Sequence, residues 1–408
     1  MFCGFAAALW LAGAEAPTKL VTVSVSPLVI SFMMVFGAFI SRWSLPALVR
    51  GTGDTFKDMR HVPHLVVWGV MAGCLWAIGN TLTVFAVRDV GLSVAFPLWN
   101  SNSLIGIVWG TLLFKELHGA NWTRKLGVIG GALIIFVGAL LISSASTSQA
   151  GHGQAGRGIA AALGAGLMFG SMYIPYRKAY ITGMNPLTFL TFFTFGEMTT
   201  VTILGVVFLG GVVPFWHEIV ANRGILFWPL LGGFMWVIGD LLQNYATKYV
   251  GISRGIPLSN TNQLWGLLWA ILVFGELHGL TGNLYAEVIG GSLLMAAGAV
   301  AIACSTASEN EYSRWKKAAL RETELYGIPS EYVRTRMEGR DDEFDAARRT
   351  WVDWLLVAGA TLVFVGLGAI ARVPHMEIRM GWLVLLSAAM LVVLVAGCVF
   401  LWRITRFS

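Results

Sequence analysis

Apolar residues fill most of the chain in long runs that short polar segments separate. Ten runs precede a polar segment at 306–350, and two more follow it. A helix needs about 20 apolar residues to cross the hydrocarbon core of a bilayer, and these runs have that length. The pattern therefore predicts an all-α integral membrane protein. The predicted spans lie near 2–22, 27–47, 65–87, 91–113, 126–145, 158–180, 186–212, 224–247, 251–274, 286–305, 353–371 and 381–402.

Part of this pattern occurs twice. Residues 66–145 align without a gap on residues 226–305 at a fixed offset of 160, with about 30 identities in 80 positions. The matches include polar residues, such as Asn100 with Asn260. Apolar composition alone does not place asparagine, proline and glutamate in register, so the alignment indicates a duplicated unit.

Weaker similarity extends the duplicated unit upstream, where Pro17 resembles Pro175 and Pro27 resembles Pro186. The unit then holds five helices, and an odd number makes the second copy enter the membrane from the opposite side. We expect a ten-helix bundle of two inverted repeats with two extra C-terminal transmembrane helices. The predicted divisions are 1–147 (first repeat), 158–306 (inverted second repeat), 307–350 (charged cytoplasmic segment) and 351–408 (two additional helices).

Composition and charge agree with a membrane protein. The chain is 56% hydrophobic and 12% charged, against roughly 25% charged residues in soluble domains. The net charge of +6 does not indicate nucleic-acid binding, because the basic residues lie in short segments between apolar runs. With both termini in the cytoplasm, 22 of the 28 basic residues fall on the cytoplasmic side. We therefore expect a multi-pass cell-membrane protein in that orientation. The count includes Arg42, Arg177, Lys248 and Arg254 as residues near the ends of spans.

The third and eighth helices carry matching polar faces. Trp76 and Asn80 lie four residues apart and share one face, as do Trp236 and Asp240, and Asn244 continues the second face. Amides and carboxylates inside a span are unfavourable unless they are paired or line water. An aromatic ring beside such groups suits a sugar or a nucleoside, so these residues are candidates for solute binding. Hydrogen bonding between helices is the alternative.

The fourth and ninth helices contain Pro97 and Pro257, each of which removes a backbone hydrogen bond, and broken helices often mark transport sites. Asn100 and Asn260 lie about 14 Å into a core of about 30 Å, near the midplane. We expect them to face the solute, with interhelical bonding again as the alternative. The neighbouring candidates are Trp99, Asn102, Asn262, Gln263 and Trp265.

Three acidic residues lie within predicted spans: Glu15, Glu197 and Asp240. A carboxyl group in a membrane interior can carry a proton, so each is a candidate for proton coupling. Glu15 has Lys19 one turn away as an alternative partner, and threonines near Glu197 can satisfy that side chain.

No motif indicates a metal, a cofactor or catalysis. The sequence Glu-Leu-His-Gly occurs at 116–119 and again at 276–279, each time where a span ends. We interpret both as helix ends, with glycine as the terminating residue. A phosphate-binding Gly-x-x-x-x-Gly-Lys-Ser/Thr loop is absent, which argues against ATP-driven transport. The chain is not expected to be an enzyme.

The repeat resembles the drug/metabolite transporter superfamily, and within it the glucose/ribose porter and rhamnose-transporter-like families. The residues that carry the resemblance are Trp76, Gly79, Asn80, Ser93, Phe96, Pro97, Trp109, Gly110, Phe114, Lys115, Glu116, Gly170, Tyr173 and Pro175. The resemblance covers about residues 1–306 and implies two inverted five-helix repeats and uptake of a sugar driven by protons or another ion. It also implies that Tyr173 is a substrate-binding residue. The first helix is degenerate against the sixth, and the last two spans fall outside the family pattern.

These observations together favour a secondary active transporter of a small polar solute, with a sugar as the favoured substrate. We expect proton-coupled uptake by alternating access. A carrier or exporter of another polar metabolite, such as a ureide, an amino acid or a drug-like compound, is the first alternative. A membrane receptor or scaffold that uses 306–350 to bind a partner is the second.

Overall fold

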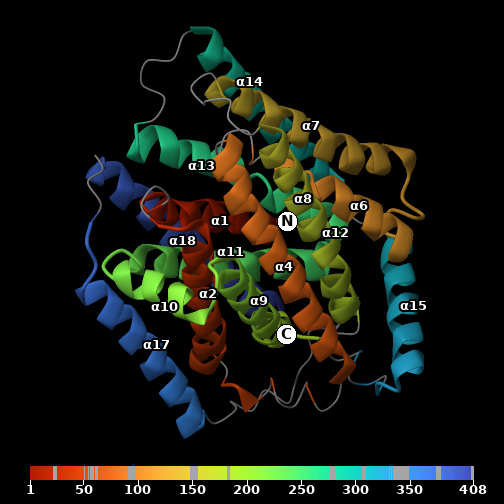
Figure 1. The fold of residues 1–408 in the computed structure, drawn as a ribbon. Helices are drawn as coiled ribbons and strands as arrows, with labels where there is room; N and C mark the ends of the chain where they lie inside the picture. The colour runs from red at the N-terminus through yellow and green to blue at the C-terminus, as the bar shows by residue number, and fades with distance from the viewer. Residues whose placement is uncertain are drawn as a thin grey trace.

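The computed structural model describes the chain except residues 22–24, 50, 54, 56–58, 60–62, 91–94, 96–97, 148–154, 182–183, 276–281, 306–308, 330, 332, 334–348, 374–377 and 406–408. Every regular element in the described part is a helix (Figure 1). The helices are α1 (Phe2–Lys19), α2 (Pro27–Val49), α4 (Pro63–Val90), α6 (Asn102–Leu113), α7 (Trp122–Thr147), α8 (Ala155–Ile181), α9 (Pro186–Phe208), α10 (Val212–Ala221), α11 (Phe227–Val250), α12 (Ile252–Ser259), α13 (Asn262–Leu268), the π-helix η1 (Trp269–Val273), α14 (Gly282–Cys304), α15 (Glu309–Tyr326), α17 (Trp351–Ala369) and α18 (Met380–Thr405).

Eight of the described helices are long and apolar enough to cross a membrane. They are α2, α4, α7, α8, α9, α14, α17 and α18. This confirms an all-α integral membrane fold. Helix α11 corresponds to the eighth predicted span. It buries much of its length inside the bundle and carries a polar face, as the sequence pattern predicts.

Two predicted spans differ from the observed helices. The span predicted at 251–274 is broken into α12, α13 and η1. The span predicted at 186–212 ends at Phe208, because Gly210 and Gly211 adopt positive φ angles of 83° and 130° that end the helix. The short helix α10 then follows, between two predicted spans, where the apolar pattern predicted no helix.

The helices of the two halves pack in matching ways. In the first half α4 packs on α8 and α9, and in the second half its equivalent α11 packs on α1 and α2. Likewise α6 packs on α8, as α13 packs on α1. Each contact is thus repeated with the halves exchanged, as a two-fold relation between the repeats requires.

The packing of α7 on α14 shows that the repeats are inverted. A Cβ atom added to Gly131 would lie 2.7 Å from the carbonyl oxygen of Gly298, and one added to Gly138 would lie 2.6 Å from that of Gly291. The residue number therefore rises along α7 as it falls along α14, so the helices run antiparallel. Because α7 and α14 are equivalent in sequence, the two halves enter the membrane in opposite directions.

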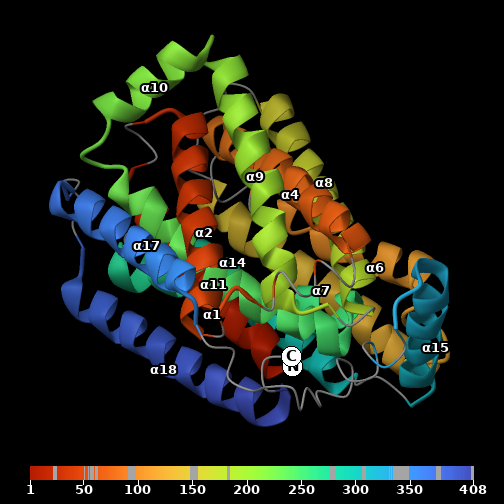
Figure 2. The ribbon, with the colours of Figure 1, turned by 90° about the horizontal axis from the view of Figure 1, so that it is seen from below.

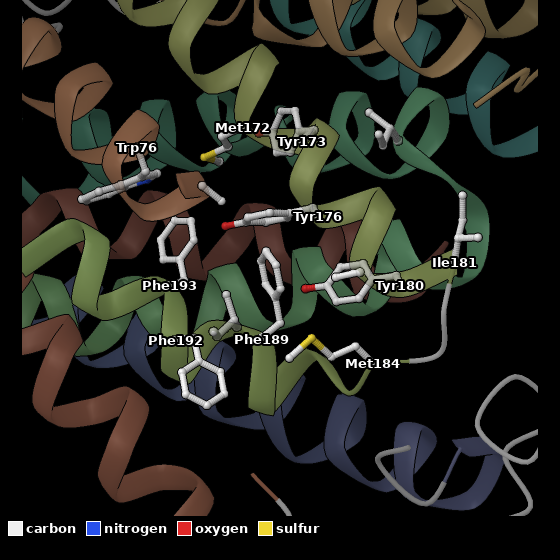
Figure 3. Packing of buried hydrophobic residues seen from close by; sticks show 14 of the residues in the cluster. Trp76, Met172, Tyr173, Tyr176, Tyr180, Ile181, Met184, Phe189, Phe192 and Phe193 are labelled. Carbon is white, nitrogen blue, oxygen red and sulfur yellow. The ribbon is translucent and has the colours of Figure 1, made fainter. Parts of the chain in front are cut away.

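An aromatic cluster fixes the wall between α8 and α9 (Figure 3). Tyr173, Tyr176 and Tyr180 follow one face of α8. The ring of Tyr176 lies 4.9 Å from that of Phe189 and 5.5 Å from that of Phe193, both in edge-to-face contact. This packing holds α8 rigidly where its tyrosines approach Trp76 of α4.

The last two helices lie on one flank, opposite α15 (Figures 1 and 2). α17 packs on α2 and α11, and α18 packs on α1 and η1. The carboxylate of Asp353 accepts hydrogen bonds from the backbone N–H and the hydroxyl of Thr52, at 2.8 and 2.7 Å. The indole N–H of Trp10 donates to the carbonyl of Met390 at 3.1 Å. These bonds attach the added helices to one side of the bundle only.

Candidate functional site

A cavity of about 90 Å³ lies between the two halves. Both repeats contribute to its wall, from α1, α2 and α4 on one side and α8, α11 and the break between α12 and α13 on the other. The residues that line it and that the sequence singled out are Glu15, Trp76, Asn80, Trp99, Asn100, Asn102, Tyr173, Trp236, Asn260 and Asn262. Thr83 and Gln243 add polar groups, and Leu11, Met34, Phe169 and Met172 add apolar surface.

The cavity lies on the two-fold relation between the repeats. Trp76 and Trp236 occupy equivalent positions, and their ring centroids are 4.6 Å apart. Asn100 and Asn260 are also equivalent, and the amide nitrogen of Asn260 lies 3.5 Å from the carbonyl oxygen of Asn100. Equivalent residues can touch only near the axis that relates the halves. The surface of the cavity is therefore shared between the repeats.

The ninth predicted span is broken between α12 and α13, and this break places an amide where the two repeats meet. α12 ends after Pro257 and Ser259, and Asn260 follows as its C-terminal cap residue. The Asn260 amide donates to the side-chain oxygen of Asn102 at 2.6 Å and to the hydroxyl of Ser103 at 2.5 Å. The equivalent Pro97, with Ser93, lies outside the described residues.

Two buried polar atoms of residues that line the cavity have no hydrogen-bond partner within the described part of the chain. One is the amide nitrogen of Asn100, a donor, and the other is the side-chain oxygen of Asn262, an acceptor. Buried polar groups are normally paired. An unpaired donor and an unpaired acceptor beside a cavity are free to bind a solute that carries hydroxyl groups.

Other polar residues of the wall are held in place by neighbours. Asn80 donates to the hydroxyl of Ser31 at 2.6 Å, and Gln243 donates to the hydroxyl of Ser259 at 2.5 Å. Both residues line the cavity. Gln263, by contrast, is buried outside the cavity wall, and Trp265 packs against an apolar cluster around Trp10.

Arg42 forms a buried ionic cluster with two of the predicted acidic residues. Its guanidinium lies 2.7 Å from Glu197 and 2.6 Å from Asp240. The rings of Phe193 and Trp236 lie 4.5 and 5.1 Å from its central carbon, in cation–π contact. The cluster joins α2 of the first half to α9 and α11 of the second. Neither carboxylate lines the cavity.

Asn244 belongs to this ionic cluster rather than to the cavity wall. Its amide donates to Asp240 at 3.0 Å, and its oxygen accepts a hydrogen bond from Tyr180 at 2.6 Å. The polar face of α11 therefore divides into two parts. Trp236 and Gln243 face the cavity, while Asp240 and Asn244 face the neighbouring helices.

Glu116 forms a second buried ionic cluster that sequence reasoning missed. Its carboxylate lies 2.9 Å from Arg177 of α8. It also accepts the backbone N–H groups of Ile252 and Ser253 at 3.2 and 3.0 Å, at the first turn of α12. Glu116 of the first half therefore ties together two helices of the second, where the motif had suggested only a helix end. The repeated motif at 276–279 lies outside the described residues.

These clusters correct one step of the orientation argument. Arg42, Arg177, Lys248 and Arg254 were counted as basic residues at the cytoplasmic surface, but all four are buried. Hydropathy alone does not separate an arginine at a helix end from one that pairs inside the bundle. The cytoplasmic placement of both termini stays a prediction.

Comparison with known proteins gives matches over most of the chain. The model of a family described as "Sugar transport protein" matches residues 54–192 and 194–324. A putative sugar uptake protein of Streptococcus agalactiae is 24% identical over 229 residues, which cover 54% of this chain and 73% of that protein.

One further relative and one solved structure also match the chain. A glucose uptake protein of Staphylococcus xylosus is 24% identical over 251 residues, which cover 59% of this chain and 77% of the relative. A solved structure titled "Crystal structure of protein" matches with a TM-score of 0.50 and 15% identity, over 73% of this chain and 97% of that one. At that identity the structural match supports the fold alone.

Proposed function

Because the chain belongs to the sugar transport protein family, we propose that it carries a sugar across the membrane by alternating access, coupled to protons. The names of its relatives, which include a glucose uptake protein, support a sugar as the solute. Glucose is therefore the first solute to test. Fold alone does not decide the solute, since one transporter fold serves many.

The observation that carries the proposal is the composition of the shared cavity. Two tryptophan rings, Trp76 and Trp236, meet at the axis between the halves. Beside them, Asn100 offers a free donor and Asn262 a free acceptor. A sugar presents an apolar face that packs on aromatic rings and hydroxyl groups that both donate and accept hydrogen bonds. The cavity matches both properties.

The inverted repeat supports alternating access. A site on the axis between two inverted halves contacts both halves equally. Rocking of one bundle against the other therefore exposes the site to each side of the membrane in turn. The buried Glu116–Arg177 pair joins the two halves across their boundary. Glu15, Glu197 and Asp240 are the carboxyl groups proposed to carry the coupling proton.

Replacing Asn100 tests the assignment of the cavity. The purified protein in liposomes is expected to take up labelled glucose, and Asn100→Ala is expected to raise the half-saturation concentration about tenfold, the equivalent of roughly 1.4 kcal/mol. Because the Asn100 amide nitrogen bonds to no described residue, the fold should survive its loss.

Asn222→Ala is the matched control, because Asn222 caps α10 away from the cavity. It should transport as the parent does. Unchanged kinetics in Asn100→Ala would remove the cavity from the transport path. An absence of flux for every sugar and metabolite tried would instead favour the receptor or scaffold role.

A further inference from the structure

Among the three carboxyl groups within the spans, we infer that Glu15 binds the coupling proton, and that it does so inside the sugar cavity itself. This inference rests on the proposed function as a carrier. Its basis is the contrast between the surroundings of Glu15 and those of Glu197 and Asp240.

Glu15 is the one carboxyl group that lines the cavity among the residues the structure describes. It makes no hydrogen bond or ion pair with them. Glu197 and Asp240 each lie within 2.7 Å of the Arg42 guanidinium and outside the cavity wall. A group that couples proton and sugar must meet both ligands, and Glu15 is placed to do so.

The groups that face Glu15 from neighbouring helices are neutral or already paired. Tyr173 of α8 shares the cavity wall, as do Asn80 of α4 and Asn260 and Asn262 at the α12–α13 break. Asp240 of α11 lies beyond the wall and is bound to Arg42 of α2. The residues of α18 packed on α1 include the neutral Leu386 and Met390. Lys19, one turn along α1, has its side chain outside the described part.

The cavity wall of the described chain contains no lysine, arginine or histidine. A lone carboxylate inside a membrane protein is unfavourable without a compensating positive charge. A neutral sugar brings none, whereas a proton neutralises the carboxylate directly. The proton binds to a carboxylate oxygen of Glu15 from one compartment. It then dissociates from the same oxygen into the other compartment, which regenerates the carboxylate.

The repeat adds an independent argument. Pro17 aligns with Pro175, so Glu15 aligns with Tyr173, and both residues line the same cavity. The two halves thus present a phenol on one side and a carboxyl group on the other. Within the described cavity wall only the first half supplies a carboxyl group, which gives one proton site for each solute site.

Glu15→Gln tests this inference, because glutamine keeps the size and hydrogen-bonding ability of the acid but binds no proton. In liposomes whose interior is one pH unit more alkaline than the outside, the parent protein should accumulate glucose about tenfold if one proton moves with each sugar. Added glucose should also carry protons inward, which an entrapped pH dye reports. We expect Glu15→Gln to lose both signals and to retain exchange of labelled for unlabelled glucose.

The outcomes separate this inference from the proposed function. If the parent moves no sugar, the carrier assignment fails. If Glu15→Gln still accumulates glucose with the gradient, or if Glu197→Gln loses accumulation while Glu15→Gln keeps it, Glu15 is not the proton site. If Glu15→Gln loses uptake of glucosamine but not the proton-driven uptake of glucose, the carboxylate instead recognises a cationic solute, and the inference is wrong.

Discussion

The guanidinium of Arg42 lies between two carboxylates in a fully buried position. A buried charge is tolerated only with partners, and here each partner comes from the other half of the molecule. The cluster therefore stabilises the contact of α2 with α9 and α11, and it leaves the cavity wall free of arginine. The sequence placed Glu197 and Asp240 inside spans, but it gave no sign that a cation eleven residues or more from any acid would pair with them.

Arg42→Ala is expected to lower the free energy of unfolding by about 3–5 kcal/mol, because it leaves two buried carboxylates without their counter-ion. Thermal unfolding in detergent measures the effect. Arg157→Ala is the comparison variant: the Arg157 side chain is 57% exposed and pairs with a single carboxylate, that of Asp89, which is 6% exposed, so its melting temperature should fall much less. Equal melting temperatures for both variants would show that the buried cluster does not stabilise the fold.

The cavity residues that the repeat identified were the more predictable part of the candidate site. Asn100 and Asn260 stand at equivalent positions after a proline, and the structure brings them together at the axis. Asn244 and Trp265 followed the same reasoning and lie outside the cavity wall. Sequence spacing gives the face of a helix but not the neighbour it meets, so it does not distinguish a wall residue from an interhelical bond.

Among the elements, the α7–α14 pair shows how small residues decide helix contact in a membrane. Apolar association gains little in lipid, so close approach of backbones is the main stabilising contribution. The helices themselves follow from runs of apolar residues and were predictable to within a few residues. Helix α10 and the division at Asn260 were not, because both depend on local backbone breaks within continuous apolar sequence.

Gly131→Ala is expected to reduce stability by about 1–3 kcal/mol, since its methyl group would approach the Gly298 carbonyl oxygen to 2.7 Å. Gly130→Ala provides a control on the same helix, because a Cβ atom there meets nothing within 4 Å. It should be neutral or slightly stabilising, given the higher helix propensity of alanine. Melting temperatures of the two variants compare them directly, and similar losses would contradict close α7–α14 packing.

For the whole molecule, Glu116 is the residue that spans the boundary between the halves at one end. It binds Arg177 and the first backbone N–H groups of α12, where a helix terminus favours an anion. Opening that end requires these bonds to break together. Under the proposed alternating access, we therefore expect the pair to favour closure of the cavity on this side.

Glu116→Gln is expected to weaken this closure, because a neutral amide loses the ion pair and places N–H groups against N–H groups. In a variant whose four native cysteines are replaced, a membrane-impermeant maleimide should label Asn100→Cys at least severalfold faster from the side where α12 begins. Glu218→Gln serves as the control. Glu218 belongs to α10, beyond the far end of α9, and accepts a hydrogen bond from the backbone N–H of Ser26. Equal labelling in both backgrounds would show that Glu116 does not control access.

The attachment of α17 and α18 to one bundle removes the equivalence of the two halves. Two interchangeable bundles would have conformations of nearly equal energy facing each side of the membrane. Here α1, α2 and α11 carry an extra lipid-facing layer, whereas α4, α8 and α9 do not. Under the proposed alternating access, we therefore expect the bundle of α4, α8 and α9 to move against the broader bundle that carries α17 and α18. If the packing free energy of α17 and α18 differs by about 1.4 kcal/mol between the two conformations, the ratio of their populations without solute changes tenfold.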